Sequence, residues 1–205
     1  MLKSRDRFHL LRVWPIWPRG AFWTLAFCVV APAGCTQEKP PPVAVTNPAR
    51  ESLRFLENKG AYVRQFGYGY GDDVLFYVAL GPSHVTPNGM IMDEIVERLR
   101  IFGRVSLDLR DSSINDDGLK HLSEQLELEG LNLRDRPITD DGVRCLCEMT
   151  ELKDLDLCGT LTTDEAVLHL TQLALLQTIN LTGTEISAAG CTQLAAALPM
   201  CEIEQ

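Results

Sequence analysis

Apolar positions in the second half of the chain recur with a period of 24 residues. Each period holds two apolar residues separated by one position, which predicts a short strand with both side chains facing a core. The pairs are Leu107/Leu109, Leu131/Leu133, Leu155/Leu157 and Ile179/Leu181. Nine residues after each pair comes a small residue: Gly118, Gly142, Ala166 or Gly190. Such a period is typical of a solenoid, whose units bury their apolar faces by stacking.

A capped helix is predicted after the strand in each 24-residue unit. A residue whose side-chain oxygen can cap a helix follows each pair at a fixed offset. These residues are Asn115, Thr139, Thr163 and Ser187. In three units an aspartate comes next, where its charge meets the positive end of the helix dipole: Asp116, Asp140 and Asp164. Because Ala166 shares the column of small residues, we interpret that column as close packing of neighbouring helices rather than positive φ.

A longer version of the unit precedes these four. Val78 and Leu80 form another apolar pair, followed at matching offsets by the candidate cap Thr86. Pro87 then suits a first helical position, where its missing N–H costs nothing. The longer unit predicts a longer helix within Met90–Phe102.

An N-terminal cap is predicted upstream, over residues 48–73. Its apolar residues indicate a helix over Ser52–Lys59, ended by Gly60. Strands are expected over Ala61–Arg64 and over Val74–Leu80, the second of which starts the repeat region. We expect the cap to close the open edge of the sheet.

Residues 1–35 predict an export signal. Basic residues precede the apolar run Ala21–Ala31, which is short for a membrane span but suits a signal peptide. The sequence fits two alternative cleavage sites. The tripeptide that ends at Cys35 resembles a bacterial lipobox, with Pro32 where that pattern has leucine, and predicts acylation of Cys35. Alternatively, Ala31-Pro32-Ala33 fits ordinary A-x-A cleavage and predicts a secreted or periplasmic protein.

Residues 36–47 predict a disordered linker. Three consecutive prolines, Pro40 to Pro42, favour extended polyproline geometry without a packed core. Behind an acylated Cys35, this linker would hold a folded domain away from a membrane. We therefore expect a lipoprotein anchored in the cell envelope, with the soluble exported form as the alternative.

Charge is distributed unevenly. Of the 19 Lys and Arg residues, five lie in residues 1–35, together with one of the 28 acids, so the rest of the chain carries a net charge of −13. From Glu151 onward there are eight acids and one lysine, Lys153. Nucleic acid is therefore excluded as a partner, because phosphate binding needs clustered Lys and Arg. An acidic surface serves solubility, and it also attracts partners with a basic surface.

The units carry a family resemblance. The string Leu155-x-Leu157-x-x-Thr160-x-Thr162-Thr163-Asp164 resembles a leucine-rich repeat. The segment Ile138–Val143 is similar to the cysteine-containing, ribonuclease-inhibitor-like subclass, and the ending Leu198–Ile203 is similar to bacterial secreted members. The resemblance covers residues 74–205. It implies an α/β solenoid with a short curved parallel sheet, helices on the convex side, about five repeats, a protein-binding role and no catalysis.

Outward-facing strand positions supply the candidate binding residues. Arginine can chelate carboxylates through two hydrogen bonds, and Asp and Asn orient a partner at little entropic cost. The candidates on the concave face are Asp108, Arg110, Asn132, Arg134, Asp156 and Asn180. The simpler interpretation of the same positions is a polar ladder on a half-solvated sheet.

Other chemistry is weakly indicated. His121, Cys145 and His169 share a column, but helices about 8–10 Å apart do not bring three side chains to one ion. We expect no metal, no cofactor and no enzyme activity, and we expect Cys158 to be the most exposed thiol. The predicted function is a non-catalytic protein-interaction module at the cell envelope, and the alternative is a structural lipoprotein without a specific ligand.

Overall fold

The computed structural model describes residues 47–67 and 74–205, which belong to one compact unit, Ala44–Gln205. The predicted signal, Cys35 and most of the predicted linker lie outside the described residues, as do residues 68–73 of the predicted cap. No helix in the described ranges is long and apolar enough to cross a membrane.

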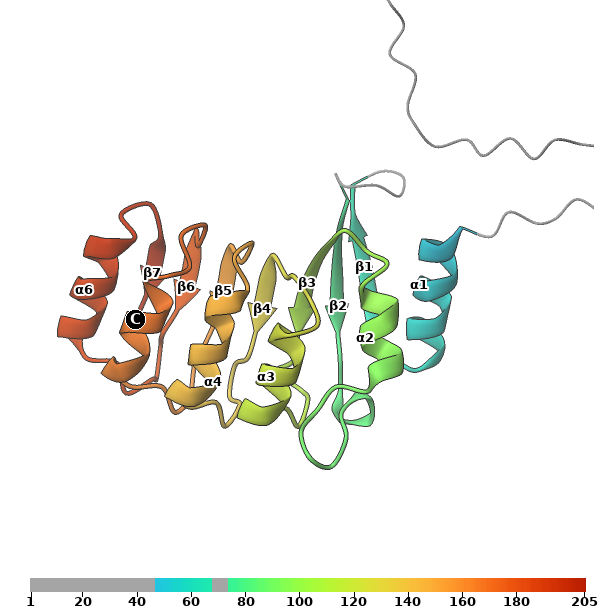
Figure 1. The fold of residues 1–205 in the computed structure, drawn as a ribbon, viewed down its shortest axis with the longest axis horizontal. Coiled ribbons are helices and arrows are strands. Elements are labelled where there is room, and N and C mark those ends of the chain that lie inside the picture. Colours follow the sequence, from blue (N-terminus) through green and yellow to red (C-terminus); the bar gives the residue numbers. More distant parts are fainter. Residues whose placement is uncertain (1–46, 68–73) are drawn as a thin grey trace, which may run out of the picture. The chain divides into compact units, whose positions relative to one another are not determined.

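A seven-stranded sheet carries its strands in chain order (Figure 1). The strands are β1 (Tyr62–Phe66), β2 (Leu75–Ala79), β3 (Arg104–Asp108), β4 (Gly130–Asn132), β5 (Asp154–Asp156), β6 (Thr178–Asn180) and β7 (Glu202–Glu204). β1 pairs antiparallel with β2, and every later pair is parallel. From β3 onward, residues 24 apart lie opposite one another, as Leu131 does to Leu155. The predicted α/β class with a mainly parallel sheet is confirmed.

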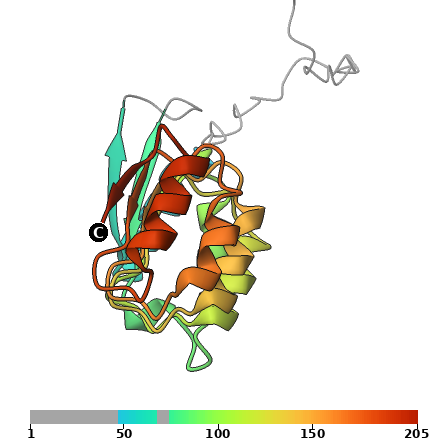
Figure 2. The same ribbon diagram turned by 90° about the vertical axis from the view of Figure 1, so that its left-hand side faces the viewer.

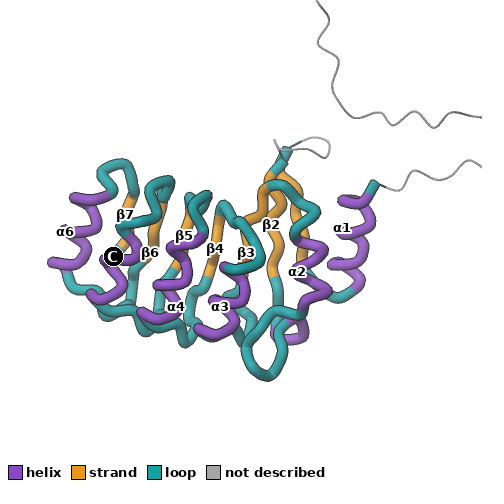
Figure 3. The backbone as a smooth tube through the Cα atoms, in the orientation of Figure 1, coloured by secondary structure: helices purple, strands orange, loops and turns teal. Residues whose placement is uncertain are grey.

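Helices form a second layer on one face of the sheet (Figures 2 and 3). They are α1 (Pro48–Asn58), α2 (Asp93–Leu99), α3 (Asp116–Ser123), α4 (Asp140–Cys145), α5 (Val167–Leu170) and α6 (Ala188–Ala197), with 3₁₀ turns η1 (Pro82–His84), η2 (Leu146–Glu148) and η3 (Asp164–Ala166). The core lies between the layers. There the strand leucines Leu107, Leu133 and Leu157 are fully buried, each contributing roughly 2 kcal/mol.

The helix caps predicted for the four 24-residue units are confirmed, whereas Thr86 does not cap α2. Asn115 and Ser187 accept hydrogen bonds from the third amide of their helices, and Thr139 and Thr163 accept from the second. In the unit that follows Thr163, the helix begins as the 3₁₀ turn η3 and continues as α5.

The aspartates after the caps join successive units. Each accepts hydrogen bonds from the backbone N–H and the side-chain hydroxyl of the next unit's cap. The pairs are Asp116 with Thr139, Asp140 with Thr163, and Asp164 with Ser187. The sequence assigned these carboxylates to the dipole of their own helix. Their contact with the next unit depends on the stacking of the helices.

Two of these carboxylates also lie against glycines of the column of small residues. A Cβ on Gly142 would overlap Oδ1 of Asp116, and one on Gly190 would overlap Oδ1 of Asp164. Neither glycine has a positive φ, so the expectation of close packing holds. At Gly142 and Gly190 the packed group is a carboxylate of the preceding unit, and at Gly118 it is the backbone carbonyl of Gly89.

Two boundary predictions are corrected. α1 begins at Pro48 rather than Ser52, because the Asn47 side chain accepts from the N–H of Ala49 and caps the helix there. Pro87 does not start a helix. It lies in a tight turn in which the N–H of Gly89 donates to the carbonyl of Thr86. The helix expected within residues 90–102 is α2, but at seven residues it is not longer than α3, because the turn takes up the extra residues.

Candidate functional site

One face of the sheet has no described helix over it, and we call it the open face (Figure 2). Burial alternates along β2 because of the strand's period of two. Phe76 and Val78 are buried toward the helices, while Leu75, Tyr77 and Ala79 are half-exposed on the open face. Each later strand adds its outward positions in register with these.

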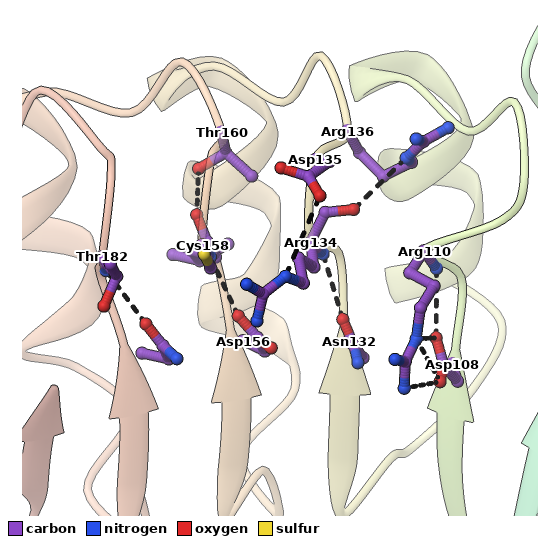
Figure 4. A network of polar contacts seen from close by, with 12 residues as sticks. Asp108, Arg110, Asn132, Arg134, Asp135, Arg136, Asp156, Cys158, Thr160 and Thr182 are labelled. Atoms are coloured by element: carbon purple, nitrogen blue, oxygen red, sulfur yellow. Dashed lines mark hydrogen bonds and ion pairs between the residues drawn. The ribbon is translucent and has the colours of Figure 1, made fainter.

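Four of the six predicted binding residues are the last residues of their strands, β3 to β6 (Figure 4). In each, Oδ1 accepts a hydrogen bond from the backbone N–H two residues ahead, at 2.9–3.1 Å. These residues are Asp108, Asn132, Asp156 and Asn180. The column is therefore a ladder of side chain-to-backbone turns, a local pattern that Asp and Asn favour. It holds the side chains in fixed orientations.

Asp108 and Arg110 form an ion pair at the end of β3. Nη2 of Arg110 lies 2.6 Å from Oδ2 of Asp108, and the Tyr77 hydroxyl donates to the same carboxylate. Burial alone would raise the pKa of Asp108, but hydrogen bonds from Arg110 and Tyr77 outweigh it and hold the pKa below its usual value. Burial, reinforced by the hydrogen bond to Asp108, raises the pKa of Tyr77. Asp108 is thus a satisfied, buried anion.

Arg134 is placed differently. Its side chain is about half exposed, as is that of Arg110, but its nearest carboxylate in the described part of the chain is Asp135 at 3.8 Å. At that distance the ion pair is loose and screened by solvent. Both arginines are therefore accessible to solvent, but Arg110 is paired tightly with Asp108, whereas Arg134 is paired only loosely.

A shallow hollow of about 310 Å³ lies on the open face, lined by residues from β2 to β7, and its acids lie on β5 and β7. Its lining includes Asn132, Asp156 and Asn180 from the predicted site, but neither arginine. The acids that line it are Asp154, Asp156, Glu202 and Glu204. Asp154 accepts from Thr178 and Glu204 from Asn180, but none of the four acids is in an ion pair within the described ranges. This end of the face is therefore negative.

Aromatic residues at the other end of the face were missed by the sequence analysis. Tyr62, Arg64 and Phe66 of β1 lie opposite Ala79, Tyr77 and Leu75 of β2 in the antiparallel register, and so share the open face. Tyr62 and Phe66 are 58% and 49% exposed. The available signal in the sequence was the spacing of Tyr62, Arg64 and Phe66 at every second position, which assigns them to one face of a strand. The predicted strand ended at Arg64, and these residues were treated only as a cap.

The thiol prediction was wrong. Cys158 is 7% exposed, whereas Cys145, Cys147 and Cys201 are half-buried. Cys158 lies two residues after β5, where the chain turns and strand alternation no longer applies. Of the column considered for metal binding, His121 lies 3.3 Å from Asp93, and the described residues hold no group of three potential metal ligands.

Comparison with known proteins gives one structural likeness to report. No protein-family model matches the chain, and no curated protein matches it. The leucine-rich-repeat ectodomain of the receptor kinase SOBIR1 from Arabidopsis thaliana is similar with a TM-score of 0.35 and 13% sequence identity. The match covers 78% of this chain and 91% of that one.

Proposed function

We propose that the chain is a leucine-rich-repeat protein of about five repeats that acts as a non-catalytic protein-interaction module. The supporting features are the 24-residue period, the parallel strands in chain order and the single layer of helices. Stacked units of this kind build an extended, curved surface, and that surface serves for binding. In this proposal the open face is the concave side of the solenoid.

The observation that best supports this function is that the two ends of the open face differ in charge and in aromatic content. Exposed aromatic side chains and Arg64 lie at the β1 end, and carboxylates without ion pairs line the hollow at the β7 end. Tyrosine and arginine are common binding hot spots, and an acidic face selects a partner with a basic surface. The fixed side chains of Asn132, Asp156 and Asn180 would orient that partner.

Crosslinking and capture from the cell envelope tests this function. Asp156→Lys with Glu202→Lys reverses charge in the hollow, and Arg110→Glu with Arg134→Glu reverses it at the strand ends. Asp117→Lys with Glu124→Lys on the helix layer changes net charge as the hollow variant does and is the matched control. We expect a partner that the wild type and the control capture and the hollow variant loses. Equal capture by all four proteins would exclude the open face as the binding surface. Recovery of bulk envelope proteins alone would favour the structural alternative.

Export and anchoring are a separate proposal. We infer from the sequence that residues 1–35 are a signal and that Cys35 is acylated behind it. Mass spectrometry of the mature N-terminus tests this directly. An acylated N-terminal cysteine is expected, and an unmodified residue from Gly34 onward would contradict acylation and favour the soluble exported form.

A further inference from the structure

The two edges of the sheet carry opposite kinds of surface. β1 pairs only with β2, and β7 only with β6, among the described strands. Edge strands present backbone N–H and C=O groups that can pair with another chain. Large apolar side chains are exposed at seven described positions, and three of these are at the edges: Tyr62 and Phe66 on β1, and Met200 just before β7.

Charge differs between the two ends of the unit. Residues 47–67, which form α1 and β1, hold four Lys and Arg residues and two glutamates. Residues 154–205, which extend from β5 through β7, hold seven acids and no Lys or Arg. Two copies of the chain therefore attract when the β1 end of one approaches the β7 end of the other.

We propose that β7 of one copy pairs antiparallel with β1 of a second copy, which extends the sheet from head to tail. Because β1 is antiparallel to β2, this pairing keeps the parallel strands of both copies aligned. The contact joins two different surfaces, so it generates an open chain of copies rather than a closed dimer.

One register satisfies both faces of the extended sheet. It sets Glu202 opposite Arg64 of the second copy and Glu204 opposite Tyr62, all on the open face. Ile203 then meets Val63 on the core side, where both residues are half-buried and pack against the apolar core. A slip of one residue would set Ile203 opposite a residue of the open face, which the alternation of side chains excludes. A slip of two residues would set Ile203 opposite Ala61 or Gln65 and separate Glu202 from Arg64, so the side-chain pairs select this register.

Apolar side chains flank the same contact. Met200 lies in the turn that leads into β7, two residues before Glu202, and Phe66 lies two residues beyond Arg64 in β1, so the pairing brings this turn toward Phe66 of the second copy. Met200 is 89% exposed and Phe66 is 49% exposed, so the contact would cover two apolar side chains that now face solvent. Opposite charges and apolar pairs directly across two strands are both stabilising.

Sedimentation velocity over a range of protein concentrations tests the proposal. We expect wild-type mass to rise with concentration at low salt, and less so at high salt, because exposed charges are screened. Arg64→Glu alone and Glu202→Arg alone should each weaken association about tenfold. An equimolar mixture of these two variants should restore it, because every contact again joins opposite charges. Arg144→Glu on α4 changes net charge equally and should leave association unchanged.

The same measurement can also show that the edge acids prevent association. Acidic residues on an edge strand can also serve to block pairing. In that case, Glu202→Gln with Glu204→Gln would increase association, whereas head-to-tail pairing predicts a decrease. A monomeric wild type at every concentration, or a mixture no more associated than its separate components, would overturn the proposal. Circular dichroism of each variant confirms that it is folded.

Discussion

Asp116 in α3 binds Thr139, the residue that caps α4, through both of its carboxylate oxygens. The Thr139 N–H lies 3.0 Å from Oδ1, and the Thr139 hydroxyl lies 2.6 Å from Oδ2. The cap of one helix is thus itself held by the helix before it. Asp140 and Asp164 repeat the contact in the next two units, so stacking and capping are coupled.

Replacement of Asp116 tests this coupling against a simple dipole effect. Asp116→Ala removes two charge-assisted hydrogen bonds and should lower the free energy of unfolding by about 2 kcal/mol. Asp117→Ala removes a charge from the same helical turn and should cost about 0.5 kcal/mol through the dipole alone. Urea unfolding measures both, and equal losses would mean that the contact between units adds nothing.

Gly142→Ala should be destabilising while Asp116 is present, because the glycine lies directly against that carboxylate. Alanine favours a helix over glycine by about 1 kcal/mol, but its Cβ would overlap Oδ1 of Asp116 and crowd Ile138. We expect Gly142→Ala to destabilise the wild type and to be less harmful in the Asp116→Ala background. A double-mutant cycle measures the coupling, and additive effects would show that the carboxylate does not set the size limit.

Acid should selectively weaken the Asp108 network. The pKa of Asp108 in the folded protein lies below its ordinary value. Its contribution to the free energy of unfolding is therefore complete above the unfolded pKa of about 4, and it is lost as pH falls through the folded pKa. Asp108→Asn keeps the acceptor for the Arg110 N–H and removes the charge. The difference in unfolding free energy between wild type and variant should therefore be constant near neutral pH and shrink below about pH 4. A difference that is flat across this range would contradict the assignment.

Removal of the Ser52 hydroxyl should stabilise the protein. It is fully buried in α1, and its Oγ has no hydrogen-bond partner among the described residues. Ser52→Ala removes an unpaired polar group and should raise the free energy of unfolding by about 1 kcal/mol. Ser123→Ala in α3, where the hydroxyl is exposed and donates to the Lys120 carbonyl, should change stability little. Thermal unfolding compares the two, and a destabilised Ser52→Ala would indicate an undetected partner.

The local sequence pattern was sufficient to predict most strands and helix starts of this protein. Strands repeat every two residues and helices every 3.6 residues, so alternating leucines and regularly placed caps identify them from neighbouring residues alone. Asn115 and Leu107 need no knowledge of distant contacts to be assigned. Likewise, the uneven charge is a property of the sequence and persists in any fold.

Tertiary structure decided what the polar residues do. Asp116 could serve its own helix or the next one, and only stacking brings Thr139 within reach of its carboxylate. Tyr62 and Phe66 became part of the open face because β1 pairs antiparallel with β2, a pairing between segments whose register no local period specifies. The sequence by itself determined the period, the strands and the capped helices, since these depend on contacts within a few residues. Structure alone determined which side chains face solvent together, because that depends on how distant segments align.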